Sequence, residues 1–153
     1  MKYIITLLSC FIFIQLFACC TKSNEMTGSP NTTLDIDSMK LKITIGTNIF
    51  TATLYNNPAV TAFKTRLPIT INMQELNGNE KYFDLPDNLP ASASDPGTIQ
   101  TGDLMLYGSN TLVLFYKTFS TSYNYTRLAR VDNHSALAVA LGSGNVTVKF
   151  ELE

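Results

Sequence analysis

The amino-acid sequence predicts a mainly β domain, a closed β-barrel of about eight strands with two short helices. Apolar and polar residues alternate over 39–45 and 146–152, which is the period of a strand with one buried face. Near-continuous apolar runs at 104–107 and 112–116 instead indicate strands that are covered on both faces. Many short strands, turn signals between them and only two helical patterns favour a barrel with a packed interior.

The first two strands are predicted to form a β-hairpin. The alternation of residues 39–45 stops at Gly46-Thr47-Asn48, a typical turn sequence, and an apolar face resumes over 50–54. The same period recurs at 69–73 and, most clearly, at 146–152. Each of these segments is expected to be a strand with one side in the core.

Two helices are predicted between the strands. Asn57-Pro58 is typical of a helix start, because asparagine caps free backbone amides and proline at the first position loses no hydrogen bond. Apolar residues then follow at helical spacing until Pro68. A second helix is expected over His134–Leu141, capped by Asn133 and closed by Gly142.

The first eighteen residues have the pattern of a secretion signal. Lys2 is followed by an apolar stretch that ends at Ala18, too short for a membrane-spanning helix of about twenty residues. Leu16-Phe17-Ala18-Cys19 resembles a lipobox, and Cys19 fits it better than Cys20 does. The alternative is an ordinary secretory signal with two incidental cysteines. We therefore expect residues 1–18 to be a lipoprotein signal peptide and Cys19 to be lipidated.

The predicted anchor places the protein at the bacterial cell envelope. Acyl chains such as palmitate on Cys19 would hold it to a membrane, and the polar segment 19–38 reads as a flexible tether to the domain at 39–153. Because Cys20 follows Cys19, the aspartate associated with inner-membrane retention is missing, and this favours the outer membrane. The domain contains no cysteine, which excludes disulfides and a cysteine nucleophile there.

Charge and composition exclude several classes of function. Without residues 1–18, which include one lysine, ten basic and twelve acidic side chains remain, a net charge of −2. The basic residues form no stripe for nucleic acid. The acidic residues are far apart in the sequence and only one histidine is present, so we expect no metal and no cofactor. We expect a monomer whose partners are the membrane, through the anchor, and a peptide or small molecule.

Five ordered segments resemble the bacterial cyclophilin-like fold family. They begin at residues 45, 67, 79, 102 and 112 and read IGTNIFTATLYNNPA, LPITI, NEKYFDLP, GDLMLYG and LVLFYKTFS. Members of this family occur alone, as lipoproteins, or as a domain following flavodoxin. The resemblance covers nearly all of residues 39–153 and implies a small cyclophilin-like barrel of eight strands and two helices.

The resemblance leaves three functional classes open. True prolyl isomerases carry an arginine shortly before a Phe-Met-x-Gln-Gly-Gly-Asp motif, whereas this chain has Arg66, Met73 and Gln74 without that motif. The favoured hypothesis is a non-catalytic module that binds a peptide or small ligand. The alternatives are a peptidyl-prolyl cis-trans isomerase that assists the folding of exported proteins and a structural component of an envelope complex.

Several residues are candidates for a binding site. Prolyl isomerisation needs a donor aimed at the proline nitrogen in an apolar pocket, and an arginine beside aromatic side chains could supply it. If residues 120–127 are extended, Tyr123, Tyr125 and Arg127 share one face. The predicted ligand-binding residues are Arg66, Glu80, Tyr82, Phe115, Tyr116, Tyr125 and Arg127.

Overall fold

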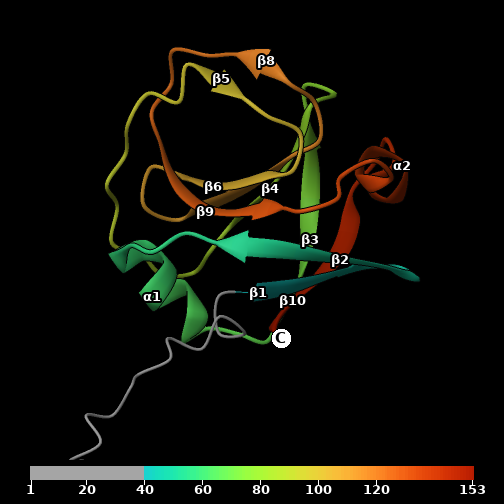
Figure 1. The fold of residues 1–153 in the computed structure, drawn as a ribbon, viewed down its shortest axis with the longest axis horizontal. Helices are drawn as coiled ribbons and strands as arrows, with labels where there is room; N and C mark the ends of the chain where they lie inside the picture. Colours follow the sequence, from blue (N-terminus) through green and yellow to red (C-terminus); the bar gives the residue numbers. More distant parts are fainter. Residues whose placement is uncertain (1–39) are drawn as a thin grey trace, which may run out of the picture. The chain divides into compact units, whose positions relative to one another are not determined.

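The computed structural model describes residues 40–153, which form a closed antiparallel β-barrel with two helices (Figure 1). In chain order the elements are β1 (Lys40–Ile45), β2 (Asn48–Leu54), α1 (Pro58–Lys64), β3 (Ile69–Leu76), β4 (Glu80–Asp84), β5 (Thr98–Ile99), β6 (Asp103–Tyr107), β7 (Thr111–Phe115), β8 (Phe119–Ser120), β9 (Tyr125–Val131), α2 (Leu137–Leu141) and β10 (Val146–Leu152). The strand order around the barrel is β1-β10-β3-β4-β7-β6-β9-β2, and β5 pairs with β8 in a separate sheet. The predicted fold class is confirmed, whereas the predicted signal, lipidated Cys19 and tether lie outside the described residues.

The predicted hairpin is formed by β1 and β2, and β1 also closes the barrel. Its alternate residues Leu41, Ile43 and Ile45 are buried. Gly46 makes the turn with φ of 58°, a conformation that costs glycine little. On its other edge β1 pairs with the last strand, β10. The two segments with the clearest alternation in the sequence therefore lie side by side.

Helix α1 begins where the sequence predicts and buries its apolar face in the barrel core. The side chain of Asn57 accepts a hydrogen bond from the first turn, and Pro58 occupies the first helical position. Phe63 is fully buried and its ring meets that of Phe150 edge-on, with 6.3 Å between centroids. The helix ends at Lys64, before the predicted end.

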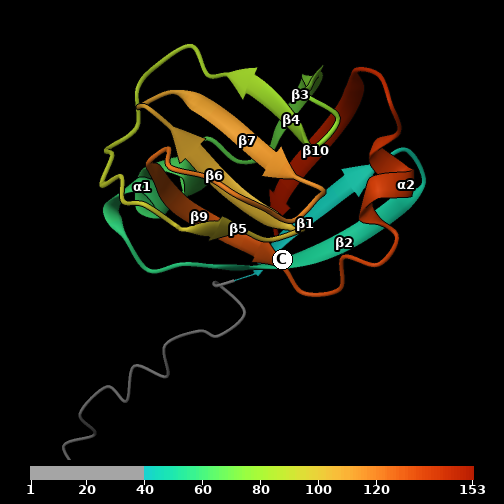
Figure 2. The same ribbon diagram turned by 90° about the horizontal axis from the view of Figure 1, so that it is seen from above.

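Helix α2 is shorter than the predicted span of 134–141. It begins at Leu137, because the Asn133 side chain accepts hydrogen bonds from the N–H and hydroxyl of Ser135 and so stabilises a local turn instead. Gly142 ends the helix as predicted, with φ of 61°. Figures 1 and 2 show α1 and α2 on opposite sides of the barrel. No helix in residues 40–153 has the length and apolar character needed to cross a membrane.

Strands β6 and β7 are covered on both faces, as their continuous apolar runs predict. Their inward side chains belong to the barrel core: Leu104, Leu106, Leu112 and Leu114. Their outward side chains Met105, Val113 and Phe115 form a second apolar group with Ile99 and Tyr125, which we call the outer cluster. Phe119 of β8 packs against the outer cluster and Ile99 comes from β5, so the small β5–β8 sheet covers this side of the barrel.

Candidate functional site

An open pocket of about 650 Å³ lies on the outer face of the barrel, next to the outer cluster. Its floor is formed by β4 and β7. The walls come from the β3–β4 turn, the end of β6, the start of β9 and the segment 119–123 that includes β8. The pocket therefore collects side chains from segments that are distant in the sequence.

The alternation of β4 places three of its residues in the pocket. Glu80, Tyr82 and Asp84 face outward and line the pocket, and the residues between them face the barrel interior. Tyr82 pairs with Val113 of β7, and Asp84 pairs with Thr111, whose hydroxyl donates to the Asp84 carboxylate at 2.6 Å. The floor thus combines two carboxylates with an apolar and an aromatic side chain.

A chain of aromatic rings forms one side of the pocket. The Tyr107 ring lies 6.0 Å from that of Tyr123 and 5.5 Å from that of Tyr125, between centroids. Phe115 extends the chain beneath the pocket, 5.5 Å from Tyr125 and 5.7 Å from Phe119. These contacts hold the segment 119–123 against the barrel, because rings in offset or edge-to-face contact attract one another.

The rim of the pocket carries hydroxyl groups. Ser120, Thr121 and Ser122 all line it. The backbone N–H of Thr121 donates to the carbonyl of Gly97 at 3.0 Å, and the Thr121 hydroxyl accepts from the N–H of Tyr123 at 3.1 Å. These bonds tie the rim to the loop before β5 and orient Tyr123 toward the pocket.

Glu80 is the most buried charged group of the pocket. The residue is 9% exposed, and within residues 40–153 its carboxylate has no hydrogen-bond or ion-pair partner. Burial, and then the nearby negative charge of Glu75, raises the pKa of Glu80 above its ordinary value. Burial and then the charge of Glu80 also raise the pKa of Tyr125 to about 12, so its hydroxyl stays protonated at neutral pH.

A second polar atom beside the pocket lacks a partner. Within residues 40–153 the side-chain oxygen Oδ1 of Asn79 is buried without a hydrogen bond, and Asn79 lines the pocket from the β3–β4 turn. Buried acceptors are normally satisfied in folded proteins. Asn79 and Glu80 therefore each contribute an acceptor without a donor from residues 40–153.

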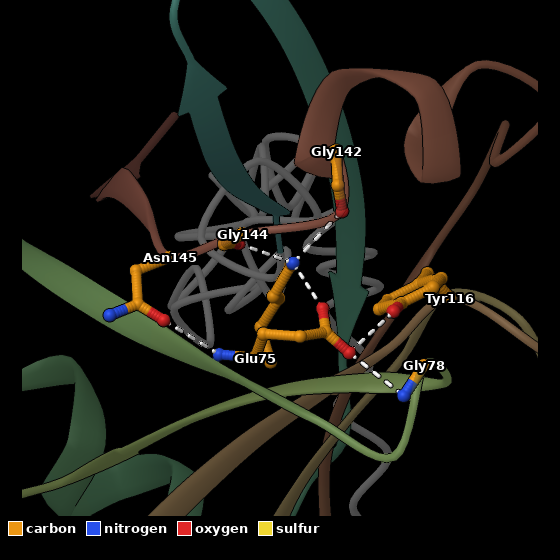
Figure 3. A network of polar contacts seen from close by, with 7 residues as sticks. Glu75, Gly78, Tyr116, Gly142, Gly144 and Asn145 are labelled. Atoms are coloured by element: carbon orange, nitrogen blue, oxygen red, sulfur yellow. Dashed lines mark hydrogen bonds and ion pairs between the residues drawn. The ribbon is translucent and has the colours of Figure 1, made fainter.

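A buried lysine lies directly behind the pocket, on the inner face of β4. The side chain of Lys81 is fully buried and forms an ion pair with Glu75 of β3. Its ammonium also donates to the carbonyls of Gly142 at 2.9 Å and Gly144 at 2.6 Å, after the end of α2 (Figure 3). All three of its N–H groups therefore have acceptors, and β3 and β4 are joined to the α2–β10 loop.

The Glu75 carboxylate is the centre of this network. Figure 3 shows it between Tyr116, whose hydroxyl donates at 2.8 Å, and Gly78, whose N–H donates at 2.9 Å. Burial disfavours its ionisation, but the hydrogen bonds from Lys81 and Tyr116 outweigh burial and lower the pKa of Glu75. Burial, followed by the bond to Glu75, raises the pKa of Tyr116 to about 12. The carboxylate of Glu75 is therefore held ionised and the tyrosine neutral.

The structure brings three of the seven predicted ligand-binding residues together. Glu80, Tyr82 and Tyr125 line the pocket. Phe115 lies beneath it as a fully buried member of the outer cluster. Tyr116 faces the opposite way, into the barrel, where it belongs to the Lys81 network.

The two predicted arginines do not line the pocket. Arg66 follows α1 and donates to the backbone carbonyls of Asp87 and Asn88, at 3.1 Å each. Arg127 lies on β9 opposite Met105 and is not among the lining residues. Arg66, Tyr82 and Phe115 therefore do not form one open pocket.

Other lining residues were not among the seven predicted ligand-binding residues, although Tyr123 was placed on one face with Tyr125 and Arg127. Tyr107 ends the apolar run 104–107, and strand alternation alone places it on the face of Met105, so the sequence contained a signal for it. Tyr123 precedes β9 and reaches the pocket through its contact with Tyr107. No sequence pattern identifies Ser120 and Ser122 as lining residues, because the fold of their loop brings them there.

Within residues 40–153, no three histidine, cysteine, aspartate or glutamate side chains are grouped closely enough to hold a metal ion. The two carboxylates of the pocket, Glu80 and Asp84, therefore have no third acidic or imidazole ligand among these residues. The pocket is acidic, because its charged lining side chains are Glu80 and Asp84 and no lysine, arginine or histidine from residues 40–153 lines it.

Comparisons with known proteins identify the family. One solved structure with a similar fold is the solution structure of a hypothetical protein from Archaeoglobus fulgidus, with a TM-score of 0.51 and 18% sequence identity. The alignment covers 76% of this chain and 95% of that one. No curated protein matches the sequence. The cyclophilin-like family matches residues 43–151, nearly the whole barrel. The chain belongs to the cyclophilin-like family.

Proposed function

We propose that this protein is a non-catalytic binding module, tethered to a membrane of the bacterial envelope, and that the pocket beside the outer cluster holds a peptide or small molecule. The pocket itself carries this proposal. Its volume of about 650 Å³ lies within the range of about 300–1,000 Å³ that is typical of ligand sites. Aromatic rings, hydroxyls and carboxylates converge on it, and such groups give a ligand both contact area and orientation.

The exposed apolar side chains support a role in recognition. Leu76, Tyr107 and Tyr123 are 40%, 46% and 62% exposed, and all three line the same pocket. Exposed apolar side chains that gather at one place on a polar surface are typical of interaction sites. A ligand that covers these residues would remove their apolar surface from water.

Binding is favoured over prolyl isomerisation because the predicted arginines do not reach the pocket. Isomerisation needs a group that donates to the proline nitrogen as the amide twists, and an arginine was the predicted donor. Among residues 40–153 no lysine, arginine or histidine lines the pocket, and Arg66 bonds to two backbone carbonyls. A coupled isomerisation assay on proline peptides is expected to show no turnover above the uncatalysed rate. Turnover that is lost in Arg66→Ala or Arg127→Ala would instead support the isomerase alternative.

Occupation of the pocket can be tested with a blocking substitution. The full-length chain in a non-ionic detergent is titrated into dye-labelled hexapeptides with basic, acidic, neutral or proline-containing centres, followed by fluorescence anisotropy. Ser122→Trp places a large ring at the exposed rim and should weaken binding at least about tenfold. Ser143→Trp, at an exposed serine that does not line the pocket, is the matched control. Absence of binding by every peptide class, or equal binding by the two variants, would contradict the proposal.

The proposed anchor requires its own test, because Cys19 is the residue that it depends on. Lipid on Cys19 would restrict the binding module to a membrane surface. Cells expressing the protein and fed radioactive palmitate should label it, and the label should persist in Cys20→Ala and disappear in Cys19→Ala. Labelling that survives Cys19→Ala would rule out this lipidation site.

A further inference from the structure

We propose that the pocket selects peptides that carry a positively charged side chain, lysine or arginine, and that Glu80 is the residue that recognises the charge. This inference rests on the proposed binding function and specifies its ligand. The observation behind it is the position of Glu80, a residue that is 9% exposed and lines the pocket, and whose carboxylate has no hydrogen-bond or ion-pair partner within residues 40–153.

A buried carboxylate without a partner is costly in a folded protein. The penalty is normally removed by a cation or by hydrogen-bond donors. The neighbouring lysine of β4 cannot serve Glu80, because Lys81 faces the barrel interior and all three of its N–H groups are used there. The other charged side chain that lines the pocket, Asp84, is also negative. The Lys117 ammonium lies close to Gly78 in the β3–β4 turn but makes no ion pair or hydrogen bond with Glu80. A cation carried by a ligand would supply the missing partner.

A cationic side chain has the donors that the Glu80 carboxylate needs. An ammonium has three N–H donors and a guanidinium has five, and a guanidinium can bond to both oxygens of one carboxylate. A neutral hydroxyl or amide ligand would supply fewer donors and no charge. Hydrogen bonds in which the donor or the acceptor is ionised are about twice as strong as those between neutral groups, and a cation adds its charge to that of the carboxylate.

The aromatic rings of the pocket favour the same class of ligand. Tyr82, Tyr107, Tyr123 and Tyr125 all line it. The faces of such rings attract cations, and their carbon atoms pack against the methylene stem of a lysine or arginine. The hydroxyls of Ser120, Thr121 and Ser122 at the rim can bond to the backbone of a peptide. A peptide is therefore the carrier of the charge that suits the pocket best.

The experiment compares capped, dye-labelled hexapeptides that differ at one central residue: lysine, arginine, glutamine or glutamate. Anisotropy titrations use the full-length chain in a non-ionic detergent. The lysine and arginine peptides are expected to bind at least about tenfold more tightly than the glutamine peptide, and the glutamate peptide should bind most weakly. In Glu80→Gln this preference should fall to about threefold or less, since the charged partner is gone.

Two carboxylate-to-amide variants control for general charge effects. Asp84→Asn removes a pocket charge that is more exposed and already accepts from Thr111, so it should change the affinity about threefold at most. Glu151→Gln removes an equal charge that does not line the pocket and should have no effect. If Glu151→Gln weakens the basic peptides as much as Glu80→Gln does, the preference reflects net charge and the inference is overturned.

The outcomes separate this inference from the proposed function. Equal affinity for the lysine and glutamine peptides, with both lost in Ser122→Trp, would overturn the charge selection and leave the binding module intact. Absence of binding by all four peptides would overturn both. Unfolding is excluded as an explanation by a thermal scan, because Glu80→Gln removes an uncompensated buried charge and should unfold at the same or a higher temperature than the unaltered protein.

Discussion

Replacement of Lys81 by methionine tests whether the buried network behind the pocket stabilises the barrel. Methionine matches the length of the lysine stem but removes the ammonium, which bonds to Glu75 and to the carbonyls of Gly142 and Gly144. The substitution therefore removes the side-chain bonds from β4 to the loop after α2 and leaves the Glu75 carboxylate without its cation, whereas the bond from the Glu75 N–H to Asn145 of that loop remains. Shape is nearly conserved, so the change in stability reports on the lost polar contacts.

The expected loss in the free energy of unfolding depends on which bonds the former partners of Lys81 keep. Removal of one member of a buried ion pair costs about 3–5 kcal/mol when the other charge has no compensation. Glu75 keeps its bonds from Tyr116 and Gly78, and its side chain is 20% exposed. Gly142 and Gly144 are exposed, so water can satisfy their carbonyls. The loss should thus lie at the lower end, about 3 kcal/mol, which lowers the melting temperature by roughly 10 °C.

Urea and thermal unfolding, followed by circular dichroism, measure this change. Lys42→Met is the matched control, because Lys42 makes an ion pair with Glu151 at 3.2 Å in which both side chains are partly exposed. Such surface pairs contribute about 1 kcal/mol at most. A double variant that adds Glu75→Leu to Lys81→Met removes the orphaned charge and should be more stable than Lys81→Met alone.

Two results would refute the reasoning. A loss of less than about 1 kcal/mol in Lys81→Met, equal to that in Lys42→Met, would mean that burial adds nothing to the network. A double variant no more stable than Lys81→Met would mean that the uncompensated Glu75 carboxylate is not the source of the instability.

Three further predictions concern the cap of helix α1 and the dependence of stability on pH. Asn57→Ala removes the cap of α1 and a 2.8 Å bond to the Arg127 carbonyl, and should lower the free energy of unfolding by about 2 kcal/mol. Asn56 is exposed, so the control Asn56→Ala should lower it by less than about 0.5 kcal/mol. The lowered pKa of Glu75 stabilises the protein at pH values above 4.5, the ordinary pKa of this group, and the contribution is lost as the pH falls through the folded pKa. The stability of Glu75→Gln should therefore decline less below pH 4.5 than that of the unaltered protein. The raised pKa of Glu80 has the opposite effect, because ionisation of this group destabilises the folded protein as the pH rises above 4.5. Glu80→Gln should therefore lose less stability than the unaltered protein over that rise in pH. Denaturant titrations at several pH values measure all three, and an unchanged pH profile in either glutamine variant would contradict the assigned shift.

Strand β4 connects the stability of the barrel to the chemistry of the pocket. Glu80 and Lys81 are neighbours in the chain, and strand alternation sends them to opposite faces. The lysine is fully satisfied inside the barrel, whereas the glutamate is unpaired beside the pocket. This asymmetry is the physical basis for assigning Lys81 a structural role and Glu80 a binding role.

The sequence predicted the barrel because most of its strands carry local signals. Alternation over β1 and β10, the Gly46 turn and the Asn57-Pro58 helix start all depend on residues close together in the chain. The start of α2 was misplaced because Asn133 can cap either a helix or a turn, and the turn at Ser135 forms instead.

The candidate site was only partly predictable from the sequence. Glu80, Tyr82 and Tyr125 were identified from the family resemblance and from aromatic composition. Arg66 and Tyr116 were also plausible on those grounds, but the orientation of a side chain depends on which face of which strand it occupies. Arg66 instead bonds to the loop after β4 and Tyr116 faces the interior.

By itself the sequence determined the period of most strands and the absence of cysteine and of a basic stripe from the domain, and it predicts lipidation at Cys19, since these depend on neighbouring residues. Only the tertiary structure decided that segment 119–123 folds over β4 and β7, that Lys81 is satisfied by the α2–β10 loop, and that Glu80 has no partner within residues 40–153. Those outcomes depend on pairings between distant strands and on the few acceptors and donors that closure of the barrel brings within reach of one another.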